Sequence, residues 1–596
     1  MNAMKSEVKG SRSLLRQPIF VISLVIAEAL TLFMTLGPLI GTPWWSGFRN
    51  YFAQDQLSYA AIATNVSQGN LAFVEPLTET GVSHYPSLWY YVIGLVSWIT
   101  HLPVHLVWTV LGIAILSGAV LAVGTVAARI STLAWTPVLP ALALLTGTMA
   151  VQTVDFWYTP LQHHAVLWAP YASIFTLNGE IAGLSIAAIT LALLVDALYK
   201  QDQTRPHRTP RAELLLAALL LGLLANVQTY TFFSIILVFA VFVSARDLTR
   251  HPSRTRAYLT IGLGILVLAF GKSIAAMLGP LPLLVLLIAA MSPSLIPATL
   301  RARRIAIPAL LITAVAASPE VVRTALGILD KDPFLTFREA SSEGLGILEP
   351  ATLVATTTWI LLFIAVSIGL WRGRQASLSA LTIALGLGFM IMPANDIWGF
   401  NQEPYRSWVQ FAILSALLLS IPLAWGLGRF PRFTREHKVL FIVATALTLT
   451  TWTIGLQDFR GFWDFAQEKG IIELEGARAK ALQTLTAETT GILLNPACMD
   501  PQVFKLITKK PVAYFNLGLA WPADEQNFKT FLDINGRHQE NPETLQKAQV
   551  EWAVTDSSCG ADWRFPNDQR VVQVATLDYP NAGGVATLTL WRVNPL

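Results

Sequence analysis

Asp55 is the acidic residue of the chain best placed for acid–base chemistry. It lies in YFAQDQLSY, residues 51–59, shortly after a long apolar segment that runs from Pro18 to Ile40. A carboxylate can take the proton from a hydroxyl group while that oxygen attacks an electrophile. We expect Asp55 near the start of a short helix, where Asp is also a favoured N-cap, so a purely structural role is the alternative.

His84 and Tyr85 precede a proline-marked aromatic run, PSLWYYV, that begins at Pro86. A histidine at this place can form hydrogen bonds with a ligand hydroxyl or a phosphate oxygen. The alternative is an ordinary polar residue at a membrane interface, where Trp and Tyr are also enriched.

A second aromatic segment, VQTVDFWYTPLQHHAVLWAPY at residues 151–171, contains Asp155, His163 and His164. Aromatic rings with polar groups at their edges suit a saccharide site, and equally an aromatic belt at the membrane surface. A metal site needs further ligands at suitable spacing, and none is evident. We therefore predict no metal site and no cofactor; a divalent metal is possible but not indicated.

Ionisable residues lie in or beside three apolar segments. Arg406 closes the segment NDIWGFNQEPYR, and we expect it to hold a phosphate group, oriented by Glu403 or Asp396. The alternative is a salt-bridged loop end. Lys272 lies within an apolar segment, where an ionisable side chain is costly, and it is a second phosphate candidate or part of a structural ion pair. Glu28, in the first apolar segment, is equally costly there, so we expect it to face a cavity or to belong to a structural ion pair.

The composition places these residues in a polytopic membrane protein. Hydrophobic residues make up 54% of the chain and charged residues 13%, with a mean hydropathy of +0.52. Soluble domains carry about a quarter charged residues. The net charge of +4 comes largely from short basic stretches beside apolar segments, so it indicates topology and gives no reason to expect a nucleic acid partner.

The basic stretches predict which connections face the cytoplasm. The N-terminus, Lys200 and Arg372 fall inside under the positive-inside rule. Because the number of crossings between the first outer loop and Lys200 must then be odd, we expect the segment 86–102 to lie flat on the outer surface and the segment 133–151 to cross. About thirteen spans result in a multi-pass plasma-membrane protein. The segments expected outside are 41–103, 152–178, 324–350, 395–406 and the tail from residue 458 to 596.

The tail predicts a small soluble α/β domain. TGILLNPAC and VEWAVTDSSC read as short buried strands, and each follows a helical pattern. RVVQVATLDY and VATLTLWRV can complete the sheet. Each of the two cysteines, Cys498 and Cys559, follows one of the first two strands. If those strands are parallel neighbours, their ends bring the cysteines close enough for a disulfide, which an oxidising compartment preserves.

The whole layout resembles the GT-C glycosyltransferases, membrane enzymes that take a sugar from a polyprenyl-phosphate carrier. The shared features are an Asp just past the first span, an amphipathic helix and the run YPSLWYY. The resemblance implies a GT-C-like domain over 1–457 and an outer α/β domain over 458–596. It also implies that Asp55 is the catalytic base, that the region around His84 faces the reaction cavity, and that a lid covers the donor from about 323–349.

Within that superfamily, the Asp55–Gln56 pair, the YPSLW run and the compact tail are most similar to actinobacterial arabinofuranosyltransferases. The implied partners are a polyprenyl-phosphate sugar donor, a glycan acceptor in the cell envelope and membrane lipid. Polyprenyl-phosphate mannosyltransferases are the near alternative. A polysaccharide polymerase, ligase or flippase would share the spans without needing Asp55, and a transporter would need charged or broken helices at the midplane.

Overall fold

A computed structural model describes residues 17–51, 53–147, 150–151, 159–160, 170–203, 211–332, 335–336, 346–372, 375–515, 542–560, 562–565 and 570–594. The chain divides into two compact units. Unit 1 comprises Met1–Pro38, Gly112–Val322 and Arg338–Phe465. Unit 2 comprises Leu39–Leu111, Arg323–Phe337 and Ala466–Leu596.

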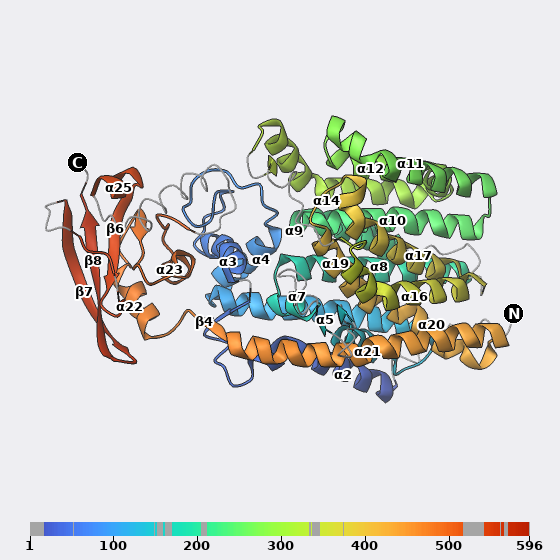
Figure 1. Cartoon of the computed structure of the whole chain (residues 1–596), viewed down its shortest axis with the longest axis horizontal. Helices are drawn as coiled ribbons and strands as arrows, with labels where there is room; N and C mark the ends of the chain where they lie inside the picture. Colours follow the sequence, from blue (N-terminus) through green and yellow to red (C-terminus); the bar gives the residue numbers. More distant parts are fainter. Residues whose placement is uncertain are drawn as a thin grey trace. The chain divides into compact units, whose positions relative to one another are not determined.

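Unit 1 is helical (Figure 1). α10 (Thr229–Arg250) packs against α17 (Ala376–Ile391), and α8 (Gly179–Gln203) packs against α9 (Arg211–Val227). Its other helices, including three that continue into unit 2, are α2 (Pro18–Leu36), α5 (Val104–Ser131), α6 (Leu139–Thr146), α7 (Tyr171–Thr176), α11 (Arg254–Leu278), α12 (Leu281–Ala289), α13 (Ser292–Arg301), α14 (Arg303–Leu329), α16 (Pro350–Arg372), α18 (Asn395–Trp398), α19 (Pro404–Leu418), α20 (Ser420–Arg429) and α21 (Arg435–Lys469).

Ten helices in the described part of the chain are long and apolar enough to cross a membrane, or eleven if the bent pair α12 and α13 forms one span. The sequence analysis expects about thirteen spans, and the helices of the described residues that reach at least 18 residues number ten or eleven. The segment 133–151, expected to cross, holds a 3-10 turn, the eight-residue α6 and the short strand β2 (Ala150–Val151) in its described part. Hydropathy marks that segment as apolar, but the proline at each of its two helical starts and the glycine after α6 divide it. α9, with 17 residues, is also shorter than a typical span.

Ion pairs join the basic ends of several helices in unit 1. Asp196 near the end of α8 pairs with Arg129 at 3.1 Å and with Lys200 at 2.7 Å. Asp202 pairs with Arg246 at 2.6 Å, and Asp247 pairs with two arginines, Arg256 and Arg301. These helix ends therefore lie together, as the positive-inside pattern predicts for one membrane face.

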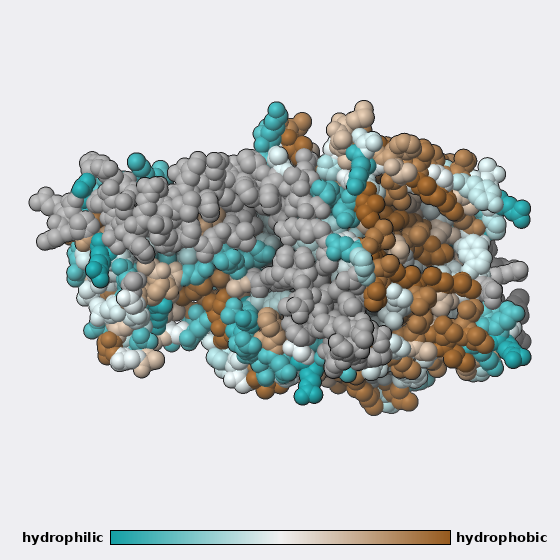
Figure 2. Space-filling view, in the orientation of Figure 1, coloured by the Kyte–Doolittle hydropathy of each residue, from teal (hydrophilic) through white to brown (hydrophobic). Residues whose placement is uncertain are grey.

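Hydrophobic side chains cover much of the described surface of unit 1 on the face that Figure 2 shows. Almost all of the apolar part of α11 is exposed on the surface of the protein, including Ile261, Ile265 and Phe270. A helix that is apolar on its exposed side suits a lipid environment.

Unit 2 joins residues 39–111 to the tail. α3 (Ala53–Ser67) packs against α4 (Leu88–Thr100) and against α23 (Pro501–Thr508) of the tail. β1 (Gly47–Arg49) pairs antiparallel with β4 (Ile471–Glu473). The remaining elements are α22 (Ala477–Leu485), β5 (Ile492–Leu494), α25 (Pro542–Lys547), β6 (Val550–Asp556), β7 (Val571–Asn581) and β8 (Gly584–Val593). The compact units thus group residues 41–103 with the tail, whereas the sequence analysis assigns them to a membrane domain.

The tail contains a four-stranded mixed sheet in the order β5-β6-β8-β7. β5 and β6 are parallel neighbours, and β7 and β8 form an antiparallel hairpin beside them. This is the α/β layer that the alternation of helical and strand patterns predicts. Leu494, Ala553, Leu545 and Trp563 contribute to its core.

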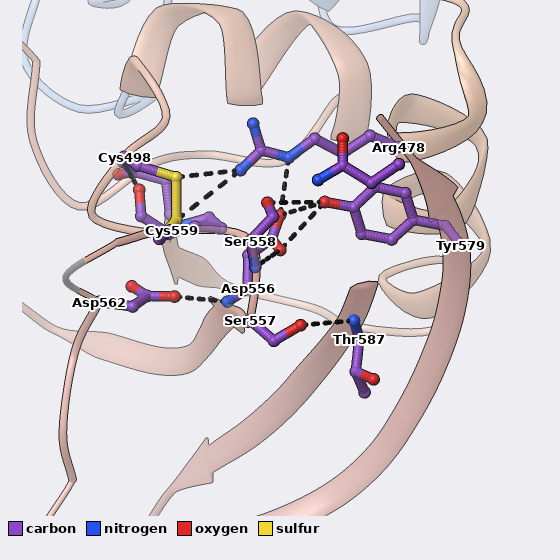
Figure 3. Close-up of polar contacts among 12 residues, drawn as sticks. Arg478, Cys498, Asp556, Ser557, Ser558, Cys559, Asp562, Tyr579 and Thr587 are labelled. Carbon is purple, nitrogen blue, oxygen red and sulfur yellow. Dashed lines mark hydrogen bonds and ion pairs between the residues drawn. A yellow bond between two sulfur atoms is a disulfide. The ribbon is translucent and has the colours of Figure 1, made fainter. Parts of the chain in front are cut away.

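A disulfide joins Cys498 and Cys559 beyond the ends of the parallel strands, with 5.5 Å between their Cα atoms (Figure 3). The neighbouring polar groups are satisfied. Asp556, at the end of β6, accepts a hydrogen bond from Arg478 Nε at 2.7 Å and from the Tyr579 hydroxyl at 2.8 Å. Asp556 is 1% exposed and its carboxylate is hydrogen-bonded, so this network stabilises the C-terminal end of β6.

Candidate active site

Asp55 lies in the first turn of α3, as the third helical residue, and is half-buried. The predicted short helix is present. A carboxylate in the first turn of a helix lies near the positive end of the helix macrodipole, which favours negative charge there. α3 is almost wholly buried from Gln56 to Val66, so its backbone is a rigid support for Asp55.

Gln502 of α23 fixes the start of α3. Its side-chain Nε2 donates to the backbone carbonyl of Gln54 at 2.9 Å and to the hydroxyl of Ser58 at 2.6 Å. Gln502 is fully buried. The tail therefore holds the residues on both sides of Asp55, which gives the C-terminal domain a positioning role.

An aromatic column runs through unit 2 from Tyr85. Tyr85 stacks on Tyr59 at 4.9 Å between ring centroids, and Tyr59 stacks on Tyr90 at 5.2 Å. Tyr90 stacks on Trp108, which meets Phe48 edge-on at 5.0 Å. Tyr59 lies one helical turn beyond Asp55 on α3, so this packing connects Tyr85 to the same helix.

His84 packs against the end of α14. Its Nε2 lies 3.8 Å from Asp332 Oδ2, and a Cβ placed on Gly327 would come within 2.8 Å of the imidazole ring. The His84 side chain is 11% exposed, and within the described residues its buried Nδ1 has no hydrogen-bond partner. The ring is held by its surroundings, and Nδ1 is a polar atom that a bound group can satisfy.

A charged cluster with a buried cation lies between the segment after α3 and α23. Lys505 Nζ pairs with Glu79 Oε1 at 2.7 Å, and both Lys505 and the neighbouring Glu75 are 0% exposed. Burial raises the pKa of Glu75 to about 7 although its Oε2 accepts hydrogen bonds from the backbone N–H groups of Leu77 and Thr78. Burial likewise lowers the pKa of Lys505. One cation thus serves two carboxylates, and the cluster fastens the tail to the first outer segment.

Arg406 lies in the first turn of α19 in unit 1. Its Nε donates to Glu403 Oε2 at 2.6 Å, and its Nη1 lies 3.9 Å from Glu180 Oε2. The guanidinium also lies 5.5 Å from the centre of the Tyr230 ring. Glu403 is therefore the residue that orients Arg406. The side chain of Arg406 remains 23% exposed, so the ion pair does not enclose it.

Asp396 does not orient Arg406. Its carboxylate lies against Gly346, and Lys272 and Glu349 are the charged groups that act on it. The backbone of Lys272 packs closely on Gly399, while its side chain is exposed. The geometry keeps Lys272 available to an anion.

Glu28 Oε1 accepts a hydrogen bond from Ser117 of α5 at 2.8 Å, while its buried Oε2 has no hydrogen-bond partner within the described residues. Asp155, His163 and His164 lie outside the described residues, as does most of the segment expected to form a lid. Among the residues that the structure describes, no group of three or more His, Cys, Asp or Glu side chains could hold a metal ion.

Sequence reasoning misses four residues of these sites. Gln502 and Asp332 contact α3 and His84 from positions far along the chain, and no local pattern signals such a pairing. Glu180 and Tyr230 are different, because each lies in the first turn of a long apolar helix, as Arg406 does. A search for polar residues at one set of helix ends would find them.

No protein-family model matches the chain, and no curated protein matches it. Among solved structures, the oligosaccharyltransferase AglB from Archaeoglobus fulgidus, in complex with an inhibitory peptide and a dolichol-phosphate, is similar with a TM-score of 0.46 and 13% identity over 91% of this chain and 70% of its own. ArnT from Cupriavidus metallidurans, bound to undecaprenyl phosphate, is similar with a TM-score of 0.47 and 10% identity over 95% and 97%.

The arabinofuranosyltransferase AftD from Mycobacteria is similar with a TM-score of 0.48 and 14% identity. The match covers 96% of this chain and 41% of AftD, so the chain spans less than half of that protein. At TM-scores below 0.5 such likenesses do not establish an activity. The residues of this chain carry the functional proposal.

Proposed function

We propose that the chain is an inverting membrane glycosyltransferase that transfers a sugar from a polyprenyl-phosphate donor to a hydroxyl of a cell-envelope glycan at the outer face of the plasma membrane. The observation that carries the proposal is the placement of Asp55. It lies in the first turn of a buried helix, in the segment that resembles the first outer loop of GT-C enzymes, and Gln502 holds the backbone beside it.

In the proposed reaction, the acceptor hydroxyl oxygen attacks the anomeric carbon of the donor sugar. The bond from that carbon to the phosphate oxygen breaks, and the electron pair leaves with the polyprenyl phosphate. Asp55 takes the hydroxyl proton, so a new glycosidic bond forms with inversion at the anomeric carbon. Removal of one such base usually costs about 10²–10⁴-fold in rate.

The leaving phosphate needs a cation, and Arg406 is our first candidate. A guanidinium can hold a phosphate through paired N–H groups, and Glu403 fixes the orientation of this one. Glu403 and Glu180 partly neutralise Arg406, so Lys272, with its exposed ammonium, is the second candidate. His84, Tyr85, Asp155 and His163 are proposed as sugar contacts.

Arabinofuranose is the favoured sugar, because the Asp55–Gln56 pair and the YPSLW run resemble the arabinofuranosyltransferases most. Mannose is the second candidate. Purified protein in detergent should be given decaprenyl-phosphoryl arabinofuranose or polyprenyl-phosphoryl mannose with matching oligosaccharide acceptors, and the release of polyprenyl phosphate measured.

Acceptor-dependent release from the arabinose donor is expected. Release from the mannose donor alone would keep the reaction and change the sugar. If neither donor turns over, and a titration shows that neither carrier lipid binds, the proposed function is wrong.

A further inference from the structure

A polar cavity of about 370 Å³ lies within unit 2, where the C-terminal halves of α3 and α4 meet α22 and α23. Ala60, Thr64 and Ser67 line it from α3, and Asp55 is not among its lining residues. Ala60, the nearest of these, is five residues from Asp55, about 7.5 Å along a helix at 1.5 Å per residue. The cavity is therefore a place distinct from the candidate base, and its size is that of a small-molecule site.

Side chains with unused polar groups point to a ligand in this cavity. Within the part of the chain that the structure describes, the side chains of His101, Gln483 and Lys509 line the cavity, are exposed, and make no hydrogen bond or ion pair. Glu475 also lines it, is 41% exposed, and faces only His105, at 3.4 Å. Together they offer an ammonium, an amide, an imidazole and a carboxylate.

This set of groups fits a polyhydroxylated ligand better than an anion. A hydroxyl both donates and accepts, so it can use the carboxylate and the ammonium at once. One Lys beside one Glu leaves little net charge for binding a phosphate. The indole of Trp98, 54% exposed, adds an aromatic face at the same cavity, against which the C–H face of a sugar ring can pack.

We propose that this cavity is a saccharide-binding site that holds a sugar unit of the acceptor glycan away from the reacting hydroxyl. The inference rests on the proposed function, because it takes the occupant to be part of the acceptor. First-segment residues and tail residues both line the cavity, so the tail would select the acceptor as well as support α3.

The test compares two exposed tryptophans of unit 2. Trp98→Ala removes a lining ring, whereas Trp45→Ala removes a ring of similar exposure, 56%, that does not line the cavity. Gln483→Ala and Lys480→Ala form a second pair on α22, since Gln483 lines the cavity and the exposed Lys480 does not. Binding of fluorescently labelled arabinofuranose and mannose oligosaccharides to the purified full chain is measured by polarisation.

We expect Trp98→Ala and Gln483→Ala each to weaken oligosaccharide binding about tenfold, the loss of one good contact, and to raise acceptor KM while kcat stays unchanged. The two controls should bind normally. Asp55→Asn should abolish turnover and keep binding, which separates this site from the reaction. Normal binding by both cavity variants would overturn the proposal even if the enzyme is active. Binding to vesicles of anionic lipid is measured for the same variants. If the cavity variants lose binding to these vesicles and keep oligosaccharide binding, the cavity is a lipid headgroup site and the proposal is wrong.

Discussion

Two charged clusters in this protein each combine one cation with two carboxylates and differ in the exposure of the cation. In unit 2, Lys505 faces Glu79 and Glu75; in unit 1, Arg406 faces Glu403 and Glu180. Lys505 is 0% exposed, whereas the Arg406 side chain is 23% exposed.

The difference separates a cluster that holds the fold from one that can bind a ligand. Burial raises the pKa of Glu75 to about 7, and the backbone N–H groups of Leu77 and Thr78 donate to its carboxylate. Glu75 is 0% exposed, so a ligand cannot reach it. The exposed edge of Arg406 lies beside an aromatic ring at one set of helix ends. Composition alone does not distinguish the two; burial does.

The largest expected effect is on Lys505. Lys505→Met leaves the buried Glu75 and the partly exposed Glu79 without their cation and should destabilise unit 2 by about 3 kcal/mol, the low end of the usual cost of breaking a buried pair, since water can reach Glu79. A lower thermal midpoint of the purified protein in detergent would show it. Adding Glu79→Gln should restore most of the loss; a single variant as stable as wild type would mean that the pair does not hold the tail.

Glu75 should make stability depend on pH. Its pKa is 4.5 when unperturbed and about 7 in the fold, so the native state binds more protons between these values and stability falls as pH rises through that window. The total change is about 3 kcal/mol at 1.36 kcal/mol per pKa unit. Glu75→Gln should flatten the profile and be more stable than wild type at about pH 8. A variant that is less stable there would contradict the assignment.

Removing both partners of the accessible cluster should cost affinity and little stability. Arg406→Gln with Glu403→Gln is expected to weaken binding of polyprenyl phosphate by about 10- to 100-fold, since a charged hydrogen bond contributes about 1.5–3 kcal/mol. Lipid titration measures it. Arg129→Gln with Asp196→Asn, near the other end of α8, is the matched control. Unchanged donor affinity would mean that Arg406 does not bind the donor phosphate.

Lys272→Ala should have the smallest effect. The side chain is exposed, so a single charge there contributes about 1 kcal/mol or less, under about fivefold in donor affinity. The same titration compares it with Arg406. A larger loss at Lys272 than at Arg406 would reverse their order as phosphate contacts.

Local patterns predict the elements of this protein well. The helix at Asp55, the short helix at 88–100 and the parallel strands before Cys498 and Cys559 all follow from hydropathy, turn residues and spacing. Segment 133–151 is the exception, because apolar composition does not distinguish a crossing helix from shorter broken ones.

Contacts between distant segments could not be predicted in this way. Gln502 lies 444 residues from Ser58, and Lys505 lies 426 from Glu79. Such pairs depend on how the tail packs, and no periodicity in either segment encodes the partner. For the same reason the grouping of the first outer segment with the tail emerges only from the structure.

Asp55→Asn tests the central claim most directly. Asn has nearly the same shape but cannot take the proton, so sugar transfer should fall about 10²–10⁴-fold while folding and donor binding stay normal. Asp500→Asn is the matched control, because Asp500 caps α23 in the same unit and Asn caps equally well. Transfer measured with the labelled donor should be lost in the first variant and kept in the second. Near-normal transfer by a folded Asp55→Asn protein would contradict the account.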